Sequence, residues 1–107
     1  MARVGPESRL VARIRDAVRE RHPDAWVFKV AGGPYQAAGV PDLLVCVEGR
    51  LFAFEVKCPR PGESEAAVRG RVTPIQWDTL GELARAGAVA EVVTTPDEVI
   101  SLLDKLW

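Results

Sequence analysis

The chain has 107 residues and a formal net charge of −1; 48% of its residues are hydrophobic and 27% are charged. These values predict one small globular domain with a modest core, and they exclude a disordered or fibrous chain. No apolar run has membrane-spanning length and no signal-peptide pattern is present, so we expect a cytoplasmic protein.

The cysteines, the single histidine and the distribution of charge indicate which kinds of functional site the chain can form. Cys46 and Cys58 lack zinc-ligand spacing and are expected to be reduced thiols, and the single His22 offers no catalytic triad. Residues 1–40 hold 7 basic and 4 acidic side chains, whereas residues 74–107 hold 2 and 6. A basic front suits a protein that meets a polyanion with one face, although uneven scatter of surface charge gives the same counts.

The first predicted element is a helix that opens at Gly5–Ser8 and runs to about Arg21. Its apolar residues recur at helical spacing: Leu10, Val11, Ile14, Ala17 and Val18. At 100° per residue, Glu7 lies about 20° from the centre of this stripe and Glu20 about 120° away. Glu7 is therefore either a first-turn acid favoured by the helix dipole or a site residue on the core side, with Glu20 as the reserve.

A short strand and a turn-rich loop follow. Trp26–Val30 has the apolar character of a strand. The next segment, Ala31–Pro41, contains three glycines and two prolines and leads directly into Asp42. Such glycines let the backbone approach a ligand closely, but they are also ordinary turn chemistry.

A β-hairpin is predicted next, from the apolar runs Leu43–Val47 and Leu51–Lys57 joined by a Glu-Gly turn. Strand alternation puts Glu55 and Lys57 on one face, opposite the aromatic residues of the same run. Hairpin pairing brings the start of the first strand, at Asp42, close to the end of the second. Two carboxylates and a lysine are therefore expected at one edge of the sheet, as a functional site or as a plain ion pair.

The polar segment Cys58–Val72 is expected to be a long, mobile loop, since it contains proline, glycine and many charges. Its arginines have two interpretations, as phosphate contacts or as solvated side chains: Arg60, Arg69 and Arg71.

The last elements have clear start signals. Thr73 as N-cap, proline at N1 and Gln76 at N3 form a capping-box pattern that opens a helix ending near Gly87. Gln76 also shares a helix face with two leucines, which turns it inward. Ala88–Thr94 predicts a buried strand and Thr95–Leu106 a capped helix. The order α-β-β-β-α-β-α predicts an α/β fold with a mixed central sheet flanked by helices on both sides.

The spacing of Asp42 before Glu55-Val56-Lys57, each on a hydrophobic strand, resembles the PD-(D/E)xK nuclease signature. The surrounding residues are similar to one branch, the virus-type replication-repair nuclease domain, VRR-NUC. The likeness runs from Glu7 to about Val93 and is carried by Lys29–Gln36, Gly39–Val45, Gly49-Arg50, Glu55–Lys57, Gln76 and Ala86-Gly87.

The resemblance implies a restriction-endonuclease-like fold and a DNA endonuclease that uses Mg²⁺ or Mn²⁺. By residue-by-residue comparison, the implied catalytic residues are Asp42, Glu55, Lys57, Glu7 and Gln76. The implied metal ligands are the carboxylates of Asp42, Glu55 and Glu7 and the backbone carbonyl of Val56. Candidate DNA contacts are Lys29, Tyr35, Gln36, Arg60, Arg69 and Arg71.

The implied partner is branched DNA such as Holliday junctions, cut by a homodimer with twofold-related sites. A non-catalytic nucleic-acid-binding or assembly module that keeps the fold is the alternative, and a structural domain with paired charges is a third. Apolar residues in excess of the core's needs support a dimer through the first or last helices, unless the two tryptophans simply cover the domain's own core: Trp77, Leu80, Leu83, Leu102, Leu103, Leu106 and Trp107.

Overall fold

The computed structural model describes residues 5–31 and 38–105. No helix within these ranges is long and apolar enough to cross a membrane. The elements, in chain order, are α1 (Pro6–Arg21), β1 (Trp26–Lys29), β2 (Leu43–Val47), β3 (Arg50–Val56), α2 (Glu65–Gly70), α3 (Pro74–Arg85), β4 (Val89–Val93) and α4 (Pro96–Asp104).

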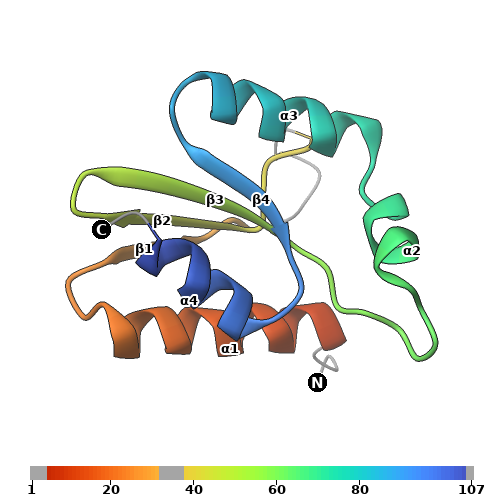
Figure 1. Ribbon diagram of the computed structural model, residues 1–107, viewed down its shortest axis with the longest axis horizontal. Helices are drawn as coiled ribbons and strands as arrows, with labels where there is room; N and C mark the ends of the chain where they lie inside the picture. The colour runs from red at the N-terminus through yellow and green to blue at the C-terminus, as the bar shows by residue number, and fades with distance from the viewer. Residues whose placement is uncertain (1–4, 32–37, 106–107) are drawn as a thin grey trace.

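The four strands form one mixed sheet in the order β1-β2-β3-β4, in which the first two pairs are antiparallel and β3 pairs with β4 in parallel. Helices α1 and α4 cover one face of the sheet and α3 lies on the other (Figure 1). The predicted mixed sheet with helices on both sides, in the order α-β-β-β-α-β-α, is therefore confirmed, with the short α2 as an addition.

A two-residue turn fixes the hairpin between β2 and β3. Glu48 and Gly49 both have positive φ, 47° and 81°, as the tightest hairpin turns require. The resulting register pairs Leu43 with Phe54, so Asp42 lies level with Glu55. A shift of one residue would turn Glu55 into the apolar core, so the turn matters for the position of this carboxylate.

The main core lies between the sheet and helices α1 and α4. Residues of β2 and β3 that point to this face are completely buried, among them Leu43, Phe52 and Phe54. A smaller cluster beneath α3 contains Leu80 and Val92. Ala53 and Glu55 point to this second face, so the predicted alternation of β3 holds.

Three helices begin at hydroxyl caps. Ser64, Thr73 and Thr95 each accept a hydrogen bond from the backbone N–H three residues later, at Ala67, Gln76 and Glu98. The capping box predicted at the start of α3 is present in full, because the Gln76 side chain also accepts the N–H of Thr73.

The prediction that Cys58–Val72 is one loop is wrong, because α2 forms within it. Ser64 caps this helix and Val68 buries its side chain, so six residues gain a packed face. Arg71 then ties the segment together by donating to the Glu63 carboxylate at 2.8 Å and to the Cys58 carbonyl at 2.8 Å. These contacts form only in the folded chain, and a helix of six residues is too short to show a periodic pattern in the sequence. Helix α2 could therefore not be predicted.

We predict that Gly39→Ala destabilises the fold far more than Gly62→Ala. Both glycines have positive φ, 87° and 77°, but a Cβ at Gly39 would overlap the Ile75 side chain and lie 2.7 Å from the Ile75 carbonyl oxygen, whereas nothing lies within 4 Å at Gly62. In urea unfolding, we expect the control, Gly62→Ala, to lower the free energy of unfolding by about 1–2 kcal/mol. Gly39→Ala should lower it by roughly twice that amount. Equal losses would contradict tight packing of α3 against the segment that leads to Asp42.

Candidate active site

The candidate site lies at one end of the sheet, where four elements deliver polar side chains. Asp42 immediately precedes β2, Lys57 immediately follows β3, and Glu55 lies on β3 itself. Glu7 comes from the first turn of α1 and Gln76 from the first turn of α3. The structure therefore brings together all five residues that the sequence analysis named as catalytic candidates.

Backbone hydrogen bonds on both sides fix Asp42. Its Oδ2 atom accepts the N–H of Val56 at 2.8 Å, and its carbonyl oxygen accepts the N–H of Val30 at 2.9 Å. The residue thus links β1 to β3 across the start of β2. Because one carboxylate oxygen is bound by a strand backbone, the direction of the carboxylate is set by the sheet.

Glu55 is almost fully buried, with 2% of its surface exposed. Its Oε2 atom accepts a hydrogen bond from Gln76 Nε2 at 3.1 Å and lies 3.6 Å from Lys57 Nζ. Its Oε1 atom is buried without a hydrogen-bond partner among the described residues. A buried carboxylate oxygen without a partner is costly, so this atom marks a place for a proton or a cation.

The pKa of Glu55 is raised from 4.5 to about 8. Burial is the main cause, and the charge of Asp42 and a hydrogen bond shared with its carboxyl raise the pKa further. The Lys57 ammonium opposes these effects but does not cancel them. In the absence of a cation, the raised pKa therefore favours the protonated form of Glu55 at neutral pH.

Lys57 lies between two carboxylates. Its Nζ atom is 3.6 Å from Glu55 Oε2 and 3.9 Å from Glu7 Oε1, and its side chain is 13% exposed. Glu7 is itself 46% exposed, so it forms the solvent-facing side of the site. The ion pair with Lys57 shows that Glu7 faces the site, as its angle on the helix predicted. The Lys57 ammonium lies between Glu7 and Glu55.

Gln76 performs two structural tasks at once. Its Oε1 atom accepts the N–H of Thr73 at 2.9 Å, which closes the capping box, and its Nε2 atom donates to Glu55. The N–H of Thr73 needs a hydrogen-bond acceptor, so the cap orients the Gln76 side chain with its amide oxygen toward Thr73. The amide nitrogen is therefore presented to the carboxylate, and the two roles considered for this residue are compatible.

The chemistry of Asp42 and Glu55 fits a hard divalent cation. Both offer carboxylate oxygens, which Mg²⁺ and Mn²⁺ prefer, and a cation would satisfy Glu55 Oε1 and offset the repulsion between the two charges. Within residues 5–31 and 38–105, no three His, Cys, Asp or Glu side chains group so as to hold a metal ion by themselves. Backbone oxygen, water or phosphate would have to complete the coordination.

The basic residues named as DNA contacts lie around this end of the molecule and on α2. Lys29 is exposed at the end of β1, and Arg60 is exposed between β3 and α2. Arg69 lies on α2 with its guanidinium 4.8 Å from the centre of the Trp77 ring. The other two residues with this role, Tyr35 and Gln36, lie outside the described residues.

Arg71 is bound within the protein. Its guanidinium holds the Glu63 carboxylate and the Cys58 carbonyl, and the hydrogen bond from Arg71 keeps the pKa of Glu63 below its usual value. Glu63 was not predicted from the sequence, since an acid eight residues before an arginine matches no local periodicity. The only signal for such a contact in the sequence is that Arg71 has few hydroxyl or amide side chains near it in the chain with which it could pair.

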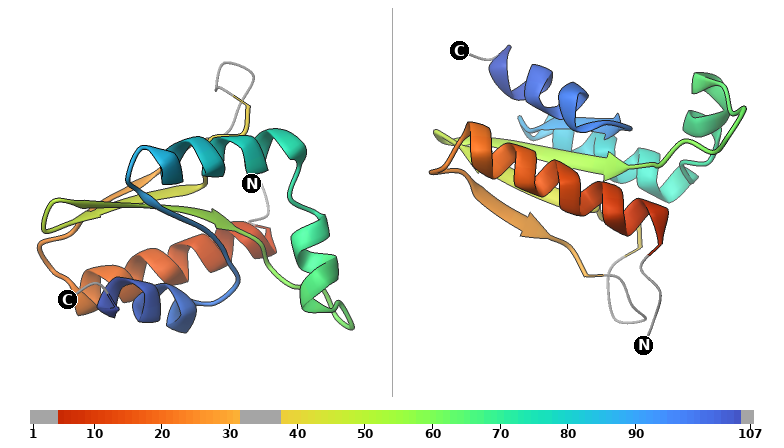
Figure 2. Two further views of the ribbon diagram at one scale, coloured as in Figure 1. Left: turned by 45° about the horizontal axis from the view of Figure 1, so that its top comes forward. Right: turned by 90° about the horizontal axis from the view of Figure 1, so that it is seen from below.

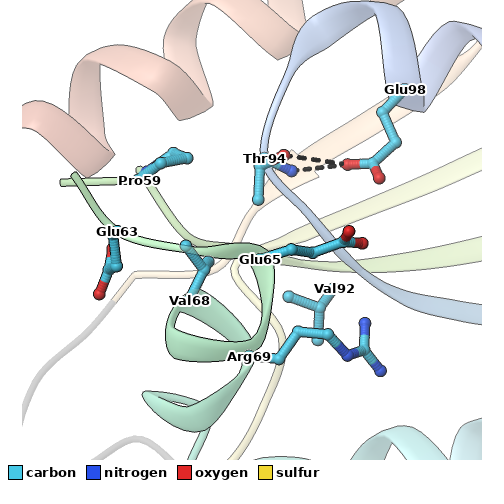
Figure 3. A pocket seen from close by; sticks show the side chains of 8 residues that line it. All are labelled: Pro59, Glu63, Glu65, Val68, Arg69, Val92, Thr94 and Glu98. Carbon is cyan, nitrogen blue, oxygen red and sulfur yellow. Dashed lines mark hydrogen bonds between the residues drawn. The ribbon is translucent and has the colours of Figure 1, made fainter. Parts of the chain in front are cut away.

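A cavity of about 200 Å³ lies elsewhere, between α2 and the segment that joins β4 to α4 (Figure 3). Glu63, Glu65 and Glu98 line it together with Arg69, and Glu98 Oε1 accepts the N–H of Thr94 at 2.7 Å. Its excess of carboxylates disfavours a phosphate, and none of the five residues described above lines it. The candidate site is therefore the carboxylate pair at the end of the sheet.

No family model and no curated protein matches the chain. Two solved structures share its fold. One, described as a "VRR_NUC domain protein", has a TM-score of 0.70 and 20% sequence identity, covering 97% of this chain and 89% of that chain. Another, described as "VRR_NUC domain", has a TM-score of 0.61 and 23% identity, covering 90% of this chain and 96% of that one. At these identities the likeness shows the fold, and it confirms the predicted fold class over nearly the whole chain.

Glu55 should make the metal-free protein less stable as pH rises. Because its pKa is raised to about 8 in the folded state, the folded protein binds more protons than the unfolded chain between about pH 4.5 and 8. The free energy of unfolding should therefore fall across this range, by on the order of a few kcal/mol, in urea titrations with a chelator present.

Glu55→Gln should flatten this dependence. Glu91→Gln, which removes an exposed carboxylate from the neighbouring strand β4, is the matched control and should keep the wild-type slope. An unchanged slope in Glu55→Gln would show that another group causes the pH dependence.

Proposed function

We propose that this chain is a Mg²⁺- or Mn²⁺-dependent DNA endonuclease that hydrolyses phosphodiester bonds in the cytoplasm, with residues 1–107 forming one nuclease domain. The observation that carries the proposal is the pair of carboxylates, the buried Glu55 and the partly buried Asp42, with the ammonium of Lys57 3.6 Å from Glu55. The shared fold with VRR_NUC structures supports a nuclease of the PD-(D/E)xK type.

The metal would be held by Asp42 and Glu55, the Val56 carbonyl and Glu7, directly or through water. When bound, a divalent cation lowers the pKa of water and neutralises charge on the phosphate. Asp42 contributes a carboxylate whose direction is set by the Val56 N–H, and Glu55 contributes one oriented by Gln76. These fixed directions mean that little reorganisation is needed when substrate arrives.

Lys57 supplies positive charge next to the carboxylates. Its ammonium can position the attacking water or stabilise the charge that develops on the phosphate oxygens. Glu7 balances this charge from the solvent side, 3.9 Å away, and restrains the lysine in the absence of substrate. A phosphate that enters would compete with Glu7 for Lys57. Its attraction to the Lys57 ammonium would draw the substrate toward the carboxylate pair.

We propose that the DNA backbone lies along the basic residues around the site. A cavity of about 330 Å³ next to Glu7 is also lined by Arg60 and Arg71, which gives a phosphate a place beside the α1 start. Lys29 and Arg69 extend this surface, and Tyr35 and Gln36 belong to the proposed set on the resemblance alone. Contacts of this kind read shape and not sequence, which suits branched DNA such as Holliday junctions and a role in DNA repair.

Cleavage of a labelled four-way junction in the presence of Mg²⁺ or Mn²⁺ tests the proposal. Asp42→Asn, Glu55→Gln and Lys57→Ala should each abolish the activity, with a loss of more than roughly a hundredfold and no loss of the fold. Glu91→Gln, which removes an exposed charge from the sheet face opposite Glu55, and Lys105→Ala, which removes one after α4, are matched controls and should cleave as the wild type does.

The alternative function, a non-catalytic nucleic-acid-binding or assembly module, gives a different result in the same assay. A wild-type protein that binds the junction but cuts neither junction nor duplex with either ion would support the module. A single variant with near-normal turnover at saturating Mg²⁺ would remove that residue from the mechanism.

We further propose that the protein acts as a homodimer whose two sites cut paired strands. The exposed positions of α1 and α4 are mostly charged, so the helices first considered for this interface offer little apolar surface, and Leu80 and Leu103 are buried in the protomer. Leu106 and Trp107 lie outside the described residues. On α3, Ile75 is 52% and Trp77 37% exposed, so we place the interface there.

Light scattering at micromolar concentration should give twice the mass of the chain. Ile75→Asp should reduce that mass to the monomer's, because a charge would be buried between the protomers. Glu82→Asp, a mild change at an exposed position of the same helix, should leave it unchanged. A monomeric wild type that still cuts both strands of a junction symmetrically would contradict the dimer.

A further inference from the structure

Two exposed aromatic side chains on the edge strand β1 have no role in the core. Trp26 is 55% exposed and Phe28 is 49% exposed. Their rings are parallel, with 1° between the planes and 5.5 Å between the centroids. Val27 between them packs against the main core, so the strand alternates as expected and directs both rings to the opposite face of the sheet.

That face is also the one on which Glu55 lies. Glu55 contacts Gln76 of α3, and α3 packs on β3 and β4. Strand β1 is at the other edge of the sheet, and the views in Figure 2 show α3 displaced from it. The aromatic pair and the carboxylate pair thus share one surface, which α3 covers on one half and leaves open on the other.

The register gives the spacing along this surface. Phe28 pairs with Leu44 and Trp26 with Cys46, two and four positions beyond Asp42. At a strand rise of about 3.3 Å per residue, the two rings lie roughly 7 and 13 Å from the level of Asp42. Stacked nucleotides are about 3.4 Å apart, so the rings are level with bases a few nucleotides from a phosphate at the site.

The chemistry of the pair suits a nucleobase. Aromatic side chains exposed on a sheet surface bind unpaired bases by stacking, whereas bases within a duplex offer no free face. Because Trp26 and Phe28 stack on each other, each keeps one outer ring face for a base.

A second copy of the chain is a poorer match for this surface. Half-exposed rings of this size present roughly 200 Å² together, whereas a stable interface takes about 800 Å² from each partner. Leu51, 37% exposed on the same face, adds one more apolar side chain, which still leaves the surface short of that area. A flat ligand the size of one or two bases matches the area that the rings present.

We propose that Trp26 and Phe28 form a stacking site for unpaired nucleobases of DNA, next to the carboxylate site. The inference rests on the proposed function in taking the ligand to be DNA, and it specifies a substrate with unpaired bases within a few nucleotides of the cleaved bond. Branch points and single-stranded flaps provide such bases, and intact duplex does not.

The test measures binding in a chelator, where no cleavage can occur. Fluorescence anisotropy with a labelled oligomer of about 15 thymidines should show tighter binding than with a duplex of the same length. Trp26→Ala and Phe28→Ala should each weaken binding of the oligomer by roughly tenfold, while Trp26→Tyr and Phe28→Tyr, which keep a ring, should stay within about threefold of the wild type. Leu51→Ala, an exposed apolar residue on the same sheet face, is the matched control and should change little.

A second readout uses the wild-type protein and does not depend on how the variants fold. A 2-aminopurine base within the oligomer should lose fluorescence on binding, because stacking quenches it. Unchanged affinity in both alanine variants, a loss of equal size in Leu51→Ala, or no quenching with the wild type would each overturn the proposal. A fall in molecular mass that accompanies the alanine substitutions would instead assign the pair to an interface between copies.

Failure of the two proposals can be told apart. Ring-dependent binding without cleavage under Mg²⁺ or Mn²⁺ would retain the stacking site and reject the endonuclease. Metal-dependent cleavage together with binding that does not depend on the two rings would retain the endonuclease and reject the stacking site.

Discussion

The buried carboxyl group of Glu55 lies beside a second, partly buried one, that of Asp42, at the end of the sheet, and much of the local structure holds the two there. The Glu48-Gly49 turn sets the register that puts them level, and the Val56 N–H fixes one oxygen of Asp42. Gln76 and Lys57 then supply an N–H donor and a positive charge to Glu55. These contacts offset part of the repulsion and desolvation that raise the pKa of Glu55 beside Asp42.

The parts of this arrangement that depend on local periodicity could be predicted from the sequence. Alternation along β3 separates Glu55 from the apolar core, and hairpin pairing brings Asp42 to the same edge. The angle of Glu7 on α1 places it toward the site, and the capping box at Thr73 marks the start of α3. The alternation, the helix angle and the cap follow from neighbours a few residues apart, and the hairpin follows from the two-residue turn between its strands, so the information is contained in short segments.

The parts that depend on tertiary contacts could not be predicted in this way. Helix α2 is only six residues long and exists because Val68 packs and Arg71 reaches back to Glu63. The exposure of Trp26 and Phe28 was equally hidden, since an apolar strand residue is expected to be covered. Whether it is covered depends on which strands α3 crosses, and that is decided by the packing of the whole sheet.

The position of α3 therefore has two consequences that belong together. By packing on β3 and β4, it buries Glu55, presents Gln76 to it and produces the raised pKa. Because it does not extend over β1, the same face is left open beside the buried pair. A helix that covered the entire face would close off the carboxylates from every side. Incomplete cover shields Glu55 from bulk water and leaves a neighbouring open surface, on which we propose that a nucleic acid lies.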